Sequence, residues 1–141
     1  MLRIRRATAY LWAFPATVLG LVFLLLAAPF GAGRVRWHSG VLEMHGRAMA
    51  WFLRYLIPIA GGASAMTFGH VVIGRDNRSL ERTRFHERVH VRQYERWGIV
   101  FYPAYLFASL WLMMKGRDAY RENPFEREAY DAEASRREGK S

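Results

Sequence analysis

The stretch His86-Glu87-Arg88-Val89-His90 places two histidines four residues apart, with an acid between them. In an α-helix, side chains four residues apart lie on the same face, one turn above the other. Two imidazoles in this arrangement can hold one zinc ion, and Glu87 can then act as a base on zinc-bound water. Helices with two such histidines also pack or hydrogen-bond without any metal. The motif alone therefore leaves a metal site and a structural histidine pair both open.

The residues around the motif predict a long helix from Leu80 to Trp97. Asn77 and Ser79 are candidate caps at its start, and Gly98 is a stop signal at its end. At about 100° per residue, the two histidines share one side of the helix. The pattern predicts that the histidines face inward, as a metal site requires, and that a basic arc faces outward, formed by Arg84, Arg88, Arg92 and Arg96.

Length and composition narrow the class of protein. The 141 residues suit one domain, or a small domain with a membrane segment. The absence of cysteine leaves histidine, aspartate and glutamate as zinc ligands. The net charge of +9 suggests nucleic acid or an anionic membrane as a partner. Residues 1–66 hold seven arginines and one acid, whereas residues 67–141 hold fourteen lysines and arginines against eleven acids. Because the excess charge flanks an apolar region and no nucleic-acid-binding motif occurs, we expect membrane lipids as partners and no nucleic acid.

Residues 1–33 predict a membrane anchor. Three arginines precede an uncharged run at residues 7–33, which is long enough to span a hydrocarbon core of about 30 Å. Trp12 and Trp37, near the two ends, are typical of the membrane interface. A cleaved signal peptide has similar basic and apolar regions, but this run is longer and Pro29 makes a poor cleavage site. We expect a single-pass N-terminal anchor in a bacterial-type inner membrane, with the side that carries the remaining chain left open.

Residues 34–141 predict a small domain of the α+β class. Residues 34–45 alternate partly and favour a strand or hairpin, and residues 46–59 favour an apolar helix. Met66 to Ile73 is expected to form one strand. The uncharged run at residues 99–114 would make a helix of about 24 Å, short of a comfortable span. We expect it to pack beneath the site, or to lie in the membrane interface with Trp111 and Tyr105 at the lipid boundary.

A third metal ligand is expected from the start of the last helix. Asn123 is a suitable N-cap, and Pro124 suits the first helical position. A carboxylate at Glu126, one turn before the small Ala129, would let this helix approach the histidines closely. Glu126 could complete a zinc triad and leave the fourth position to water. It also stands where a capping box has its acid, so that structural role stays open.

His86-Glu87-x-x-His90, followed by Glu126-x-x-Ala129, resembles the gluzincin zinc peptidases, especially the very small and the integral-membrane members. The resemblance implies that His86, His90 and Glu126 bind Zn²⁺ and that Glu87 is the general base. It also implies that the strand before the motif helix is an edge along which an extended peptide aligns.

The resemblance covers residues 66–133 and departs from the family at one position. The membrane members usually have aspartate directly after Glu-x-x-Ala, whereas here Tyr130 stands there and Asp131 follows. Glu128 therefore stays an alternative third ligand or a supporting residue. Tyr120 and Tyr130 are both candidates to stabilise an oxyanion.

These observations predict a mostly helical, zincin-like domain with a short β-hairpin or edge strand and an N-terminal transmembrane helix. The expected function is hydrolysis of a peptide or protein substrate by zinc-activated water. The alternative is a non-catalytic membrane protein whose metal site is structural or degenerate.

Overall fold

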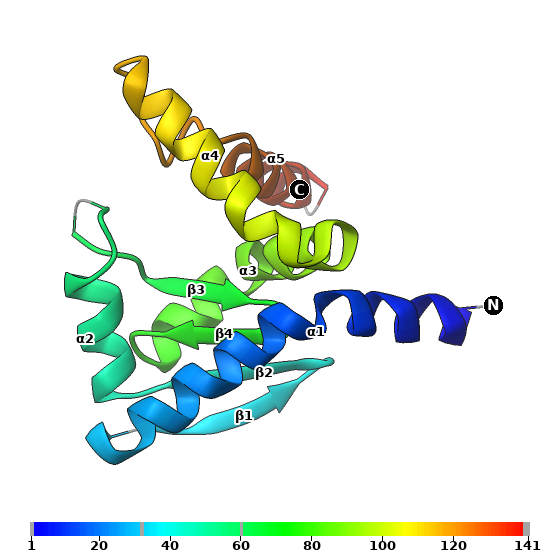
Figure 1. Cartoon of the computed structure of the whole chain (residues 1–141), viewed down its shortest axis with the longest axis vertical. Coiled ribbons are helices and arrows are strands. Elements are labelled where there is room, and N and C mark those ends of the chain that lie inside the picture. The colour runs from blue at the N-terminus through cyan, green and yellow to red at the C-terminus, as the bar shows by residue number, and fades with distance from the viewer. Residues whose placement is uncertain (1, 32, 60, 140–141) are drawn as a thin grey trace.

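The computed structural model describes residues 2–31, 33–59 and 61–139, in which helices surround one four-stranded sheet (Figure 1). The mixed α and β content expected from the sequence is confirmed. In chain order the elements are α1 (Leu2–Ala27), η1 (Ala28–Phe30), β1 (Val35–His38), β2 (Val41–His45), α2 (Arg47–Tyr55), β3 (Ala65–Phe68), β4 (Val71–Gly74), α3 (Asn77–Trp97), η2 (Gly98–Val100), α4 (Phe101–Met114) and α5 (Pro124–Glu138).

The sheet consists of two antiparallel hairpins joined by a parallel pair of strands, in the order β1-β2-β4-β3. Residues 34–45 form the first hairpin. The single strand expected at Met66 to Ile73 is wrong, because the chain turns at Gly69-His70 and pairs Thr67 with Val72. Gly69 has a φ of 57°, a left-handed conformation that glycine adopts without steric cost.

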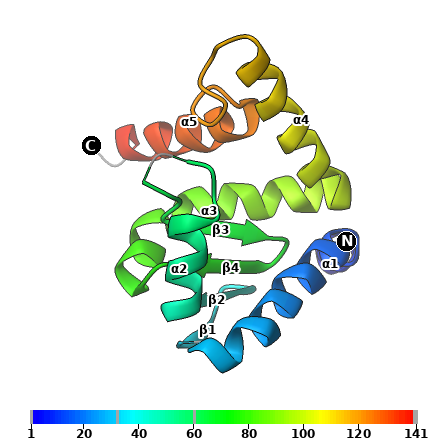
Figure 2. The same ribbon diagram turned by 60° about the vertical axis from the view of Figure 1, so that its left-hand side comes forward.

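Helices cover both faces of the sheet, because successive side chains of a strand point to opposite faces. One face carries Val71 and Ile73 and packs against α1 and α2. The other face packs against α3. The sheet therefore lies between α3 on one side and α1 with α2 on the other (Figure 2). The cluster between the sheet and α3 contains Val41, Val72, Leu80 and Val91.

α1 packs closely on the folded chain through small residues. A Cβ atom added to Gly20 would lie 2.7 Å from Cβ of Val71, so only glycine permits this approach. The backbone amide of His70 donates a 3.0 Å hydrogen bond to Oγ1 of Thr17. α1 thus contributes to the core of the structure. Among residues 7–27, for which burial is described, the buried residues are Ala13, Ala16, Gly20 and Ala27.

Two helical stretches, residues 7–30 and 77–114, are long and apolar enough to cross a membrane, judged by length and composition alone. Signal sequences and core helices of soluble proteins can have the same properties. The apolar N-terminal helix expected from the sequence is confirmed as α1. That residues 1–33 act as a separate anchor stays a prediction.

Candidate metal centre

Three side chains that can bind a metal converge where α3 meets α5. His86 and His90 lie on α3, and Glu126 lies in the first turn of α5. All three are buried, and their candidate ligand atoms lie within 4.8 Å of one another. The Glu126 carboxylate is 3.0 Å from Nε2 of His86 and 3.4 Å from Nε2 of His90, and the two Nε2 atoms are 3.2 Å apart. Two imidazoles and one carboxylate suit zinc and leave a fourth position open.

α3 holds the two histidines on one rigid element. Its N-cap is Asp76, whose side chain accepts a 2.7 Å hydrogen bond from the amide of Ser79. The expected caps, Asn77 and Ser79, are therefore wrong, because both lie inside the helix. The expected end at Trp97 is confirmed, and Gly98 follows with a φ of 59°.

α5 brings Glu126 to the histidines because its first residues are tied to α4. Asn123 caps α5, as expected, and its side-chain amide donates to the backbone oxygen of Tyr105. The backbone amide of Asn123, which a capping-box acid would bind, donates instead to the backbone oxygen of Tyr120. The Glu126 carboxylate accepts a 2.7 Å hydrogen bond from the Tyr105 hydroxyl and faces His86.

Gln93 determines which nitrogen of His90 faces the cluster. Its side-chain nitrogen donates to the backbone oxygen of Phe125 and to Glu128, each at 3.0 Å. The Gln93 oxygen therefore faces Nδ1 of His90, at 2.8 Å, and Nδ1 carries a hydrogen. Nε2 of His90 is left to the cluster. Glu128, the alternative third ligand, lies outside the cluster, where Gln93 and Arg96 bind its exposed carboxylate.

The charges in the cluster favour a cation. Burial disfavours the charged form of Glu126, but the hydrogen bonds with His86 and His90 outweigh burial and lower the pKa of the carboxyl to about 2. Burial also disfavours the protonated form of His90, but the hydrogen bond with Glu126 raises the pKa of that imidazole to about 9. The carboxylate thus attracts positive charge to the two Nε2 atoms, where a metal ion would displace a proton.

Glu87 lies beside the cluster and is buried. Its carboxylate accepts a 2.7 Å hydrogen bond from the hydroxyl of Thr67 on β3. Burial raises the pKa of Glu87 above its ordinary value, although the nearby charges of His90 and His86 oppose the change. A buried carboxylate with a raised pKa, next to a set of metal ligands, is a candidate proton acceptor.

A hollow between β3 and α4 connects Glu87 with His90 and Glu126. Its other walls are mostly aromatic and aliphatic, and they include Met66 on β3 and Tyr102 on α4. The candidate base and two of the candidate ligands therefore border one apolar space at the edge of the sheet.

The tyrosines near the cluster have different positions. Tyr120 lines the hollow. Tyr130 packs against the ring of His86, with ring centroids 4.8 Å apart. Tyr105, which the sequence places at the lipid boundary as one alternative, instead binds Glu126. The role of Tyr105 could not be predicted from the sequence, because residues 99–114 carry no charge that would distinguish the inner face of α4 from the outer one. The one signal for an inward-facing Tyr105 is its spacing of four residues from Phe101.

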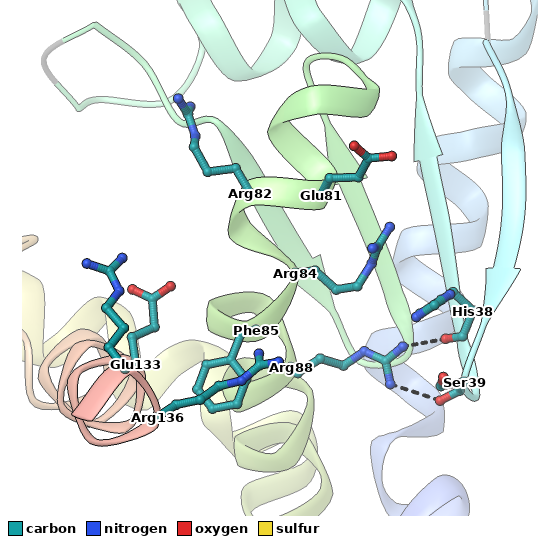
Figure 3. Close-up of a pocket in the computed structure, with 10 residues that line it drawn as sticks. His38, Ser39, Glu81, Arg82, Arg84, Phe85, Arg88, Glu133 and Arg136 are labelled. Carbon is teal, nitrogen blue, oxygen red and sulfur yellow. Dashed lines mark hydrogen bonds between the residues drawn. The ribbon is translucent and has the colours of Figure 1, made fainter. Parts of the chain in front are cut away.

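A second, larger hollow lies on the outer face of α3 and is rich in arginine (Figure 3). Arg88 donates to the backbone oxygens of His38 and Ser39, in the turn between β1 and β2. Arg136 of α5 lies over the Phe85 ring, 4.6 Å from its centroid. These contacts attach the first hairpin and α5 to α3. The expectation that the arginine arc faces solvent is therefore wrong for Arg84 and Arg88, which are half-buried, and holds for Arg92 and Arg96.

Comparisons with protein-family models, with curated proteins and with solved structures give no match to this chain.

Proposed function

We propose that this protein is a zinc-dependent peptidase that hydrolyses peptide bonds at a membrane. The observation that supports the proposal most strongly is the convergence of His86, His90 and Glu126. Glu87 lies in the hollow that His90 and Glu126 also line. A structural metal site is usually closed by four protein ligands, whereas a catalytic zinc site keeps one position for water. Three candidate ligands beside a buried carboxylate fit the catalytic type of site.

The residues in and beside the cluster divide into metal ligands, a base and a residue that orients the base. Zinc held by His86, His90 and Glu126 supplies a Lewis acid and lowers the pKa of water. Glu87 takes a proton from the attacking water and passes it to the leaving amine. The Thr67 hydroxyl holds one oxygen of Glu87 and so fixes the orientation of the carboxylate.

The edge of the sheet offers a place for the substrate. β3 is an edge strand, and it borders the hollow that contains Glu87. An extended peptide can add to such an edge through backbone hydrogen bonds, and its side chains can enter an adjoining pocket. The aromatic and aliphatic lining suits an apolar side chain next to the scissile bond. Tyr120, which lines the hollow, is the candidate donor to the oxyanion.

The membrane location rests on the apolar helices. The sequence predicts a single-pass anchor within residues 1–33, and α1 has the length and composition for it. α1 also packs along the sheet, and a helix in close contact with a folded sheet places that sheet at the same depth.

The experiment that tests the proposal compares wild type, Glu87→Gln and Glu81→Gln. Each protein is loaded with zinc and incubated with a mixture of unfolded protein substrates, and the zinc content is measured in the same samples. Glu87→Gln should keep zinc and lose hydrolysis, because the base is removed while the ligands remain. Glu81→Gln makes the same change at an exposed position of α3 and should act like wild type.

Three results would count against this proposal. Hydrolysis by Glu87→Gln at the wild-type rate would remove Glu87 as the base. Loss of zinc together with activity would assign Glu87 a ligand or folding role. A zinc-loaded wild type that hydrolyses none of the substrates would favour the alternative of a non-catalytic membrane protein.

A further inference from the structure

α1 and α4 expose an unusually large apolar surface. Leu11 and Leu25 on α1 are 75% and 71% exposed, and Phe107 and Met114 on α4 are 69% and 72% exposed. Each helix packs through a narrow stripe and leaves the rest of its apolar circumference uncovered. Helices that are apolar on all sides are normally covered by protein or by lipid, and an exposed apolar patch of this kind marks an interaction surface.

The two helices lie on the same side of the molecule. α1 and α4 both lie on the near side in Figure 1 and along the right-hand side in Figure 2. They meet where Ala13 and Ala16 of α1 pack with Tyr94 and Phe101. We call the exposed sides of α1 and α4 together the apolar face.

The charges around the apolar face fit an anionic lipid surface. Residues 1–42 and 96–117 contain no acidic residue, although both segments contain arginine; Asp118 and Glu122 follow the second segment, and Arg117 pairs with Glu122. At the end of α4, Lys115 lies over the exposed Trp111 ring, 4.9 Å from its centroid. Tryptophan and lysine together at the end of an apolar helix are typical of the boundary between hydrocarbon and headgroups.

The packing of α1 opposes a crossing of the membrane. Residues 13–27 lie along the folded chain, from Ala13 beside Tyr94 to Ala27 in the cluster with Met44. A crossing by this segment would carry the open edge strand β1 and its exposed Arg36 into the hydrocarbon. An unpaired sheet edge does not occur in contact with lipid, and a buried arginine there is costly. α4 by itself is about 21 Å long, shorter than the hydrocarbon core of about 30 Å.

We infer that α1 and α4 lie flat in the headgroup region of an anionic bilayer and bind it without crossing it. In this arrangement α1 attaches the chain to one surface of the membrane, whereas the sequence predicts that it crosses the membrane as a single-pass anchor. The inference does not depend on metal binding or on peptide hydrolysis.

Cysteine labelling distinguishes the two arrangements, because the full-length chain has no cysteine of its own. Ala7→Cys and Val35→Cys place single thiols at exposed positions before and after the packed part of α1. Both are treated with a membrane-impermeant maleimide in sealed membrane vesicles, and again after the vesicles are opened. Surface attachment predicts that both thiols label from the same side. Labelling from opposite sides would overturn the inference in favour of a crossing helix.

Vesicle flotation identifies what covers the apolar face. Full-length protein is mixed with vesicles of phosphatidylcholine alone, or of phosphatidylcholine with phosphatidylglycerol. Binding should be stronger to the anionic vesicles, and Leu25→Glu or Phe107→Glu should weaken it at least about tenfold. Ala134→Glu makes the same change in charge at an exposed position of α5, away from the apolar face, and should bind like wild type.

Thermal unfolding of each glutamate variant is measured as well, to check that the variant keeps the fold. Wild-type binding by both glutamate variants would overturn the inference. So would a stable dimer without detergent that Phe107→Glu dissociates, because a second copy of the chain would then cover the apolar face.

Discussion

Tyr105 shows how a single side chain outside the predicted motif can support the candidate centre. Its hydroxyl donates a 2.7 Å hydrogen bond to Glu126, whose other oxygen faces His86. Residues that hold metal ligands in place typically change metal affinity by about 10- to 100-fold when they are replaced. Burial and the charge of Glu126 raise the pKa of Tyr105 far above its ordinary value, so this hydroxyl stays a donor at any working pH.

The change Tyr105→Phe removes that hydrogen bond and keeps the ring. We expect zinc affinity, measured by competition with a chelator, to fall about tenfold while the fold is kept. Tyr55→Phe is the matched control, because it makes the same change at an exposed side chain of α2, outside the hollow. Equal zinc affinity in the two variants would show that Tyr105 does not position Glu126.

At the scale of elements, a charged contact ties the first hairpin to α3. Glu43 of β2 is almost fully buried, and Arg84 of α3 donates to its two oxygens at 2.8 and 2.9 Å. Burial alone would raise the pKa of Glu43, but the Arg84 guanidinium outweighs burial and holds that pKa below the ordinary value of 4.5. Removing one partner would leave the other charge partly buried and unpaired.

The change Glu43→Gln should therefore lower the free energy of unfolding at pH 7 by about 2 kcal/mol. Because the pKa is lower in the folded state, the charged pair stabilises wild type above pH 4.5, and this contribution is lost as the pH falls below that value. Thermal unfolding in mild detergent between pH 7 and pH 3 should show a smaller loss in the variant than in wild type. Parallel curves for the two proteins would contradict the assigned role.

The elements that sequence reasoning predicted well are those with strong local signals. Histidine spacing and Gly98 located α3, and Asn123 located the start of α5. The turn at Gly69-His70 was missed because it lacks the Asn-Gly or Asp-Gly pair that marks a tight hairpin. The sequence of the last helix left Glu126 open between a metal ligand and a capping-box acid, because forty residues separate it from His86 and no local signal indicates that the two side chains meet.

At the scale of the whole molecule, α1 determines whether the chain divides into an anchor and a domain. The sequence places the boundary at residue 33, so that residues 34–141 would fold alone. In the structure, α1 contributes buried residues to two core clusters, one beside the sheet and one beside Tyr94 and Phe101. A deletion of α1 would expose both clusters to water.

We therefore expect a chain that lacks residues 1–33 to lose its cooperative unfolding and its zinc, rather than to be released as a soluble domain. Circular dichroism on heating, together with zinc content, would measure both effects. The full-length Phe107→Glu variant is the control, because it changes the apolar face without removing buried residues. A truncated chain that unfolds cooperatively and binds zinc like wild type would show that residues 34–141 form an independent domain.

We propose that His86, His90 and Glu126 bind one metal ion. The most direct test is the zinc content and zinc affinity of the purified wild type beside Glu126→Gln and Glu128→Gln. The two variants lose the same charge two positions apart, but only Glu126 lies in the cluster. We predict a single zinc ion per chain in wild type and in Glu128→Gln, with affinity at least about a hundredfold weaker in Glu126→Gln. Equal affinity in the two variants, or a wild type that binds no zinc after reconstitution, would contradict the account.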